Sequence, residues 1–346
     1  MIKSRIKYLL AVLVLISSSP ALAQSGGFAG VGLSLGFGPR GMAISNAMAA
    51  STFEGIYPYY NPALAAYKSI GNQIDMSVSA LDFDRVYQTF GSTFQLPPNA
   101  GLSIGLIRSG VRDIDERSLS GYPLGTFDLA EYQLNTTFGL RFSERFSGGV
   151  SFKLNYANYH KELSATTAVG VDLGILYRFG NYLNFGFTVQ DMFANYTWNS
   201  GDLYNQSQAR NVVNNFPTRL KWAFSYQREK YAIQTEYELQ TYGSEVNTQV
   251  SFVDENGNPF QISQLNTINT STGLLKLGGT WHAHDRLSLR GGYRISDTKV
   301  SGSGSLSAGF SVHLPFDTFA PSIDYAFVTE PYGVSNIHVF ALRLNL

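Results

Sequence analysis

The segment Arg286–Ser296, RLSLRGGYRIS, alternates apolar and polar side chains from end to end. Its odd-numbered positions carry Leu, Leu, Gly, Tyr and Ile, whereas its even-numbered positions carry Arg, Ser, Arg, Gly, Arg and Ser. Because successive side chains of a β-strand point to opposite faces, this pattern predicts a strand with one apolar and one polar face. The segment is also about as long as a tilted strand must be to cross a bilayer.

The same period of two recurs along most of the chain. Each repeat covers ten residues or more, whereas strands of soluble proteins usually have about five or six, so a large soluble β-protein is the less favoured alternative. We predict fourteen strands, at residues 72–82, 85–95, 98–109, 129–142, 145–159, 165–179, 182–195, 216–228, 230–242, 271–283, 286–296, 303–315, 319–328 and 335–346.

The connections between these segments alternate in length. Beginning after the second segment, every other join is a short turn, such as SER or REK, and three of the remaining joins are long: 110–128, 196–215 and 243–270. Short turns on one side and long loops on the other are typical of outer-membrane barrels. We therefore predict an all-β, fourteen-stranded antiparallel transmembrane barrel over residues 71–346, with its short turns in the periplasm.

Composition and the N-terminus favour the same class of protein. Residues 1–23 have a basic start, a short apolar core and an Ala-Leu-Ala ending, which predicts a cleaved signal peptide. Charged residues are 14% of the chain against about 25% in soluble domains, the net charge is zero, and there is no cysteine. We therefore expect the outer membrane of a Gram-negative bacterium, outer-membrane lipid and the barrel assembly machinery as partners, and no nucleic acid.

The Gly-rich block before the first strand lacks this alternation. Between Gly36 and Tyr67, the residues around Met42 and Ala47 suit a short helix of small side chains, whereas Pro58 and Pro62 prevent a regular helix further on. An irregular segment with few charges needs buried partners for its backbone groups. We predict that the barrel buries this block and is plugged by it.

The polar strand faces carry charges of both signs. The candidate lumen charges are Arg219, Lys221, Glu236, Glu238, Arg290 and Arg294. They could cross-link the lumen by ion pairs, or form the selectivity ring of a water-filled channel. We favour the ion pairs, because a plugged barrel needs no open polar pore.

The sequence offers little support for catalysis or metal binding. His282 and His284 could share a strand face, but no third ligand is evident nearby. The segment 254–258 resembles the start of a calcium loop, yet Leu265 stands where a bidentate Glu is required, so Asn256-Gly257 is better interpreted as a hairpin turn. We expect no enzymatic activity, no metal and no cofactor.

The whole mature chain resembles the FadL-like outer-membrane superfamily, and in particular its PorV/PorQ branch. The residues that carry the resemblance are Arg40-Gly41-Met42, Asn46-Ala47, Tyr60-Asn61-Pro62-Ala63-Leu64, Leu275-Lys276-Leu277-Gly278, Leu289-Arg290-Gly291-Gly292-Tyr293-Arg294, Ser307-Ala308-Gly309-Phe310 and Ile323-Asp324-Tyr325-Ala326-Phe327. The C-terminal residue, Leu346, departs from the Phe that barrel assembly signals usually carry.

This resemblance implies that residues 24–70 form a hatch that plugs the barrel, and it also implies a hatch motif and two alternative functions. The motif would comprise Asn61, Pro62 and Ala63 with Arg40 and Gly41. A PorV/PorQ-like protein would dock proteins of type IX-like secretion, through long loops with candidate anchors Tyr122, Phe127, Trp198, Tyr204 and Phe216. The alternative, a FadL-type transporter, would bind a hydrophobic small molecule such as a fatty acid or hydrocarbon between hatch and wall, with candidate contacts Met42, Met48, Phe53 and Tyr57.

Overall fold

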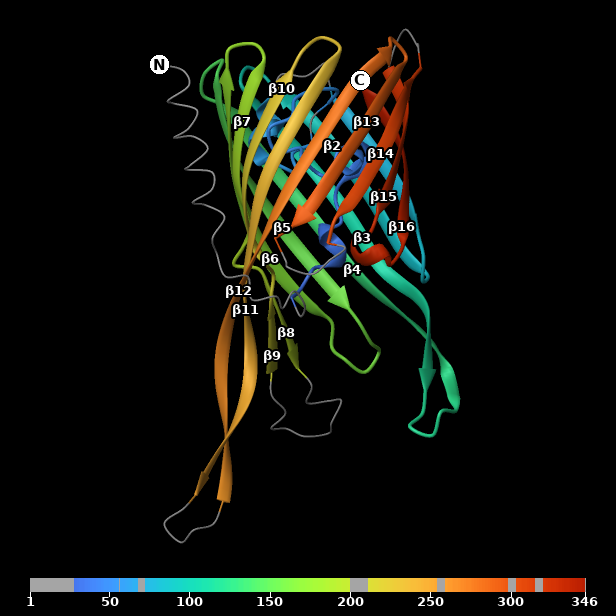
Figure 1. The fold of residues 1–346 in the computed structure, drawn as a ribbon, viewed down its shortest axis with the longest axis vertical. Coiled ribbons are helices and arrows are strands. Elements are labelled where there is room, and N and C mark those ends of the chain that lie inside the picture. The colour runs from blue at the N-terminus through green and yellow to red at the C-terminus, as the bar shows by residue number, and fades with distance from the viewer. Residues whose placement is uncertain are drawn as a thin grey trace.

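The computed structural model describes residues 28–55, 57–67, 72–199, 211–253, 259–297, 303–314 and 320–345. Within these residues, fourteen strands form one closed antiparallel barrel, which confirms the predicted fold class (Figure 1). The strands are β1 (Gln73–Leu81), β2 (Arg85–Leu96), β3 (Ala100–Arg117), β4 (Pro123–Arg141), β5 (Phe146–Asn158), β6 (Thr166–Phe179), β7 (Leu183–Met192), β10 (Thr218–Gln227), β11 (Tyr231–Val253), β12 (Pro259–His284), β13 (Leu287–Ser296), β14 (Ser305–His313), β15 (Ala320–Thr329) and β16 (Asn336–Asn345).

Pairing of the first and last strands closes the barrel. β1 runs antiparallel to β16, with a continuous register from the Gln73–Asn345 pair to the Leu81–Ile337 pair. Closure leaves the barrel without an unpaired sheet edge, as a strand structure in hydrocarbon requires. In the part of the chain that is described, no helix is long and apolar enough to span a membrane.

Two pairs of strands are longer than the sequence pattern predicts. β3 with β4, and β11 with β12, continue as paired ribbons beyond the barrel wall, through much of the predicted loops 110–128 and 243–270 (Figure 1). Outside the membrane a strand needs no lipid-facing apolar side, so alternation of hydrophobicity no longer marks it. The turn proposed at 256–257 lies outside the described residues, although Val253 pairs with Pro259 on either side of it.

The third long loop contains a small sheet of its own. β8 (Asn195–Asn199) and β9 (Asn211–Asn215) form an antiparallel pair separate from the barrel. The predicted signal peptide and Tyr204 lie outside the described residues.

The barrel is apolar outside and polar inside. On β16, for example, Phe340 and Leu342 are 49% and 45% exposed on the outer face. On the inner face, charged residues such as Lys153 and Asp172 are each only 1% exposed. This distribution is the reverse of that in a soluble protein and suits a wall surrounded by lipid.

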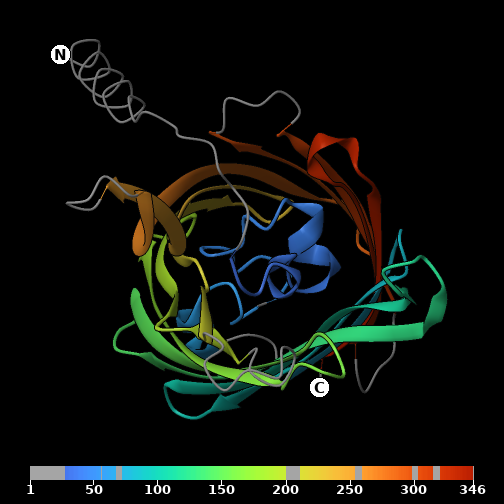
Figure 2. The same cartoon turned by 90° about the horizontal axis from the view of Figure 1, so that it is seen from below.

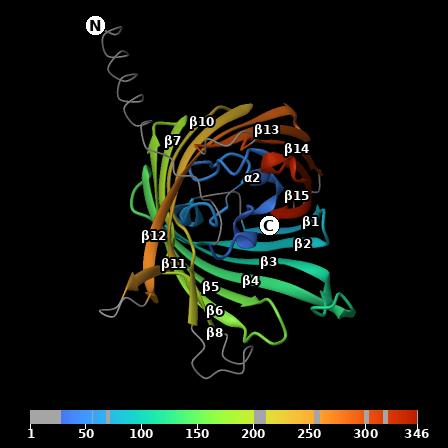
Figure 3. The same ribbon diagram turned by 60° about the horizontal axis from the view of Figure 1, so that its bottom comes forward.

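The described residues 28–67, here called the hatch, lie inside the barrel (Figures 2 and 3). They form short helices, η1 (Gly32–Ser34), α2 (Gly38–Ala43) and η2 (Pro62–Ala66), joined by turns. The prediction of a helix extending through Met42 to Ala49 was wrong: α2 ends at Ala43, because Ser45 and Asn46 adopt positive φ angles of 55° and 62°. Such left-handed residues do not continue a helix.

Candidate functional site: the hatch in the barrel lumen

Inward-facing glycines let the hatch backbone touch the barrel wall. A Cβ atom on Gly101 would lie 1.8 Å from the carbonyl oxygen of Ala65, and one on Gly186 would lie 2.3 Å from that of Ala49. Gly139, Gly149, Gly174, Gly278, Gly292 and Gly309 meet the hatch in the same way. No other residue type permits this approach, which gives many of the 34 glycines a structural role.

The predicted motif residue Asn61 connects two parts of the hatch to the wall. Its side-chain amide donates to the carbonyl oxygens of Ala49 (2.7 Å) and Ile175 of β6 (3.0 Å), and its Oδ1 accepts from the backbone N–H of Ala63 (3.0 Å). The last bond caps η2, whose first residue is Pro62, a position where a missing N–H costs nothing. Asn61 has no exposed surface.

The other two motif residues lie in α2. The Arg40 guanidinium contacts Asp324 of β15 at 2.9 Å and donates to the Ser322 hydroxyl at 2.7 Å. Gly41 gives room for the phenol of Tyr60, since a Cβ there would lie 2.3 Å from the Tyr60 hydroxyl oxygen. Arg40 therefore fixes the helix to the wall, and Gly41 allows the rest of the hatch to fold against it.

A second group of ionic contacts, the Glu54 cluster, lies near the short turns. The Glu54 carboxylate forms an ion pair with Arg290 and lies 2.9 Å from His282 Nδ1. Its backbone carbonyl accepts from Arg343, whose Nε also bonds Asp75 at 2.5 Å. Glu54 thereby ties the hatch to β12, β13 and β16, and Arg343 continues the contact to Asp75 on β1, the strand that pairs with β16 to close the barrel. His284, by contrast, is on the exposed side of a β-bulge and does not join His282.

A bulge in β7 builds the next group, the Asp191 cluster. Asp191 has a φ of 58°, and the register with β6 shifts at this point. Its carboxylate therefore turns into the lumen, where it contacts Lys153 at 2.7 Å and Arg219 at 2.8 Å. Lys153 also pairs with Asp172 at 2.7 Å.

The Lys276 cluster continues this belt of charge across β10, β11 and β12. Lys276 lies 2.8 Å from Glu236 and also pairs with Glu238, which in turn lies 3.7 Å from Lys221. The second oxygen of Glu236 accepts from the backbone N–H of Ala49 in the hatch. Arg294, on β13, makes no ion pair with any described residue.

The lumen is apolar at the end that carries the long loops. There, Tyr87 and Ile107 of the wall pack with Phe37 and Tyr59 of the hatch, under Tyr196, Trp198 and Phe216 of the β8–β9 region. Trp198 and Phe216 are each 6% exposed, so the prediction that they anchor a docked protein was wrong: they are inside the molecule. Tyr122 is 73% exposed on the β3–β4 ribbon, and Phe127 stacks edge-on against His160.

The four candidate ligand contacts are distributed around the hatch. Met42 packs against Ile337 and Val339 of β16, and Met48 belongs to the apolar cluster of the long-loop end. Phe53 packs on His282, and the ring of Tyr57 lies under the Arg343 guanidinium at 4.5 Å. Of these, Met42 borders a cavity of about 60 Å³ between hatch and wall, which is also lined by Leu35, Val328, Ile337 and Arg294.

Sequence analysis missed several residues of the ionic clusters. Glu54 lies in the irregular block, where no periodicity shows which way a side chain points. Asp191 faces inward only because of the bulge, and Asp75 and Arg343 are isolated charges on otherwise uncharged inner faces. The alternation in β16 could have identified Arg343 as inward, because its neighbours Leu342 and Leu344 belong to the predicted outer face.

Solved structures of outer-membrane channels share the fold of this barrel. The chain is similar in structure to the CymD monoaromatic hydrocarbon channel, with a TM-score of 0.60, 15% identity, and coverage of 90% of this chain and 96% of that one. It is similar to the Ralstonia pickettii toluene transporter TbuX, with a TM-score of 0.62, 13% identity, and coverage of 91% and 100%. A Pseudomonas aeruginosa FadL homologue gives a TM-score of 0.58 at 10% identity, covering 89% and 97%.

At these identities the likeness establishes a shared fold. No family model and no curated protein matches the sequence. Membership of the PorV/PorQ branch therefore stays a hypothesis.

Proposed function

We propose that this protein is an outer-membrane channel of a Gram-negative bacterium that admits hydrophobic small molecules, with the hatch as its gate. The structural neighbours named as hydrocarbon or toluene transporters support this proposal. The protein acts without chemistry on its substrate. Its short turns face the periplasm and its ribbons face the outside.

The observation that carries the proposal is the separation of apolar and ionic zones in the lumen. An apolar compound arriving from outside meets the aromatic cluster around Tyr59, Tyr87 and Tyr196, whereas a hydrated polar solute would lose its water there. Below this cluster, the described residues of the hatch and the paired charges of the wall occupy the lumen (Figure 2). A substrate can pass only if part of the hatch moves.

The small cavity beside Met42 indicates where such movement begins. At about 60 Å³ it is far smaller than the roughly 300–1,000 Å³ of typical ligand sites. Met42 is unbranched and flexible, so its displacement would enlarge the space between α2 and the wall. Arg294, which has no ion-pair partner among the described residues, borders the same cavity.

A reversible cross-link can test the gate, because the native chain has no cysteine. The Ser45 and Ser307 hydroxyl oxygens lie 2.9 Å apart, one on the hatch and one on β14. In the variant Ser45→Cys/Ser307→Cys, we expect oxidation to stop uptake of labelled toluene by expressing cells and a reductant to restore it. The single-cysteine variants, treated identically, are the controls. Uptake that continues in the oxidised variant would refute gating, and absence of toluene uptake in the wild type would refute the channel.

Docking of a secreted protein is a second candidate, favoured by the β11–β12 ribbon. Residues 243–253 and 259–270 continue the paired strands beyond the wall, and eleven residues of strand extend roughly 35 Å. Such a ribbon could present a surface to a partner of type IX-like secretion. Deleting 243–270 should abolish co-purification of a partner while toluene uptake continues. If the deletion stops uptake and no partner is found with the intact protein, docking is excluded as the function.

A further inference from the structure

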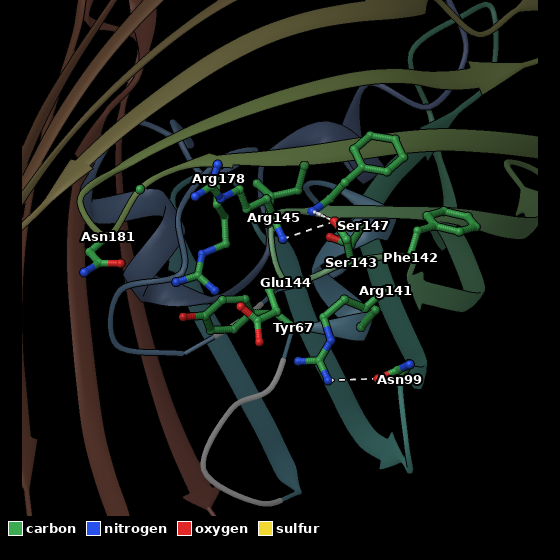
Figure 4. Close-up of a pocket in the computed structure, with 14 residues that line it drawn as sticks. Tyr67, Asn99, Arg141, Phe142, Ser143, Glu144, Arg145, Ser147, Arg178 and Asn181 are labelled. Atoms are coloured by element: carbon green, nitrogen blue, oxygen red, sulfur yellow. Dashed lines mark hydrogen bonds between the residues drawn. The ribbon is translucent and has the colours of Figure 1, made fainter.

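A large cavity lies at the short-turn end of the barrel. It measures about 760 Å³ and is bordered by the β4–β5 and β6–β7 turns, by Asn99 of the β2–β3 turn and by the end of the hatch at Ala66 and Tyr67 (Figure 4). This volume is within the range of small-molecule sites. None of the ionic clusters described above contributes a residue to it.

Three arginines and one glutamate supply the charge of this cavity. Arg141 donates to the backbone carbonyl of Pro98 (3.3 Å) and to Asn99 Oδ1 (3.1 Å), which holds its side chain in place. The guanidinium groups of Arg145 and Arg178 have no hydrogen-bond acceptor among the described residues, and neither forms an ion pair with Glu144. With Glu144 counted, the lining carries a net charge of +2 (three arginines less one carboxylate).

The fold positions the Arg178 side chain beside the hatch. The Arg178 guanidinium lies 5.6 Å from the centre of the Tyr67 ring, so the hatch itself supports it. The backbone N–H of Arg178 also donates to the carbonyl of Arg145 at 2.8 Å, which links the two turns. Both side chains therefore border one space.

The apolar part of the lining comes from aromatic rings. Tyr67, Phe142 and Phe146 border the cavity, whereas Ala66 and Leu176, at 3% and 1% exposure, add almost no accessible surface. Guanidinium donors bind carboxylate and phosphate oxygens in pairs, whereas the aromatic rings offer contact to a hydrocarbon group.

We propose that this cavity binds small amphipathic anions, that is, organic molecules with a carboxylate or phosphate end group. The anionic end contacts Arg145 and Arg178, and the apolar part lies against the rings of Tyr67 and Phe146. Its role as the periplasmic release site of the channel rests on the proposed function. Binding itself does not depend on transport.

The site can be tested in purified protein with a fluorophore on Asn181→Cys, at the rim of the cavity. The probes are hexanoate, hexyl phosphate and hexanol, which share one tail and differ in charge. We expect the two anions to bind and hexanol to bind at least tenfold more weakly. In the labelled background, Arg145→Ala and Arg178→Ala should each weaken anion binding roughly tenfold, as loss of a charge-assisted bond does.

Arg228→Ala is the matched control, because Arg228 also lies at a short turn and stacks on Tyr182 at 3.7 Å, but does not line the cavity. Equal affinity for hexanol and hexanoate would overturn the proposal. So would an equal loss of anion affinity in all three arginine variants. Inorganic phosphate that binds as tightly as hexyl phosphate would overturn the amphipathic part of it. Toluene uptake by the same variants reports separately on the channel, since toluene has no charge.

Discussion

At the scale of single residues, Asn61 shows how the hatch is held. Its three hydrogen bonds link two hatch segments and β6 without contact with water. In Asn61→Ala, buried carbonyl groups lose their donor at a cost of about 1–3 kcal/mol each. We expect a loosened hatch in an intact barrel, seen as greater sensitivity of expressing cells to large antibiotics. Asn158→Ala, at an exposed position of β5, is the control; equal sensitivity of the two variants would contradict this role.

Glu54 makes docking of the hatch sensitive to acid. Burial opposes its charged form, but hydrogen bonds from His282 and His313 and the charge of Arg290 outweigh burial and hold the pKa of this carboxyl below its ordinary value. The stabilisation is therefore complete above the ordinary carboxyl pKa of about 4.3 and is lost as the pH falls through the lower pKa of the docked state.

A nitroxide on Val31→Cys, an exposed hatch position, would report this transition as increased spin-label mobility. We expect the label to stay immobile at pH 5 and to become mobile in stronger acid. In Glu54→Gln, which leaves Arg290 without its carboxylate, the label should be mobile already at pH 7. A mobility that is independent of pH in both proteins would show that Glu54 does not hold the hatch.

At the scale of elements, β13 shows that the two faces of one strand tolerate substitution of glycine differently. Gly292 faces the lumen, where a Cβ would lie 2.5 Å from the backbone carbon of Ile44. Gly291 faces outward, and its Cβ would find its nearest neighbour at 3.9 Å. We expect Gly292→Ala to destabilise hatch docking by about 1–3 kcal/mol through overpacking, and Gly291→Ala to leave it unchanged. Hydrogen exchange of the α2 amides measures the difference; equal exchange rates would disprove the close contact.

The same elements explain what the sequence could predict. β13 has no bulge, so its alternation gave its two faces, and its limits to within one residue. The β7 bulge could not be predicted from the local sequence. Asp191, which has the positive φ, bonds Lys153 and Arg219, and both residues are far from Asp191 in the sequence. The path of the hatch could not be predicted either. The hatch backbone contacts the wall only where inward-facing glycines leave room for it, and the sequence does not show which hatch residue meets which glycine. The resemblance placed Asn61 and Pro62 in the hatch motif, but it did not show which backbone groups Asn61 would bond.

At the scale of the whole molecule, assembly of the barrel and closure of its lumen are separate properties: the strands provide the first and the hatch provides the second. The closed strand network satisfies its own backbone groups, so the barrel should assemble without the hatch, as judged by a gel mobility that changes on boiling. The lumen then left behind would be lined by charged groups such as Lys153, Asp172 and Lys276, which water can solvate.

If the hatch alone closes the lumen, its removal should change the ion conductance of the protein. In planar bilayers the intact protein should be silent, because the hatch fills the lumen, whereas deletion of residues 28–67 should give stepwise ion conductance. Loss of the Ala49 and Arg40 contacts in the deletion variant also frees Glu236 and Asp324 to face water, which favours cations near these positions. Conductance of the intact protein equal to that of the deletion variant would mean that the hatch does not seal the barrel. A deletion variant that folds, as shown by its heat-sensitive mobility, yet stays silent would mean that the wall charges close the lumen without it.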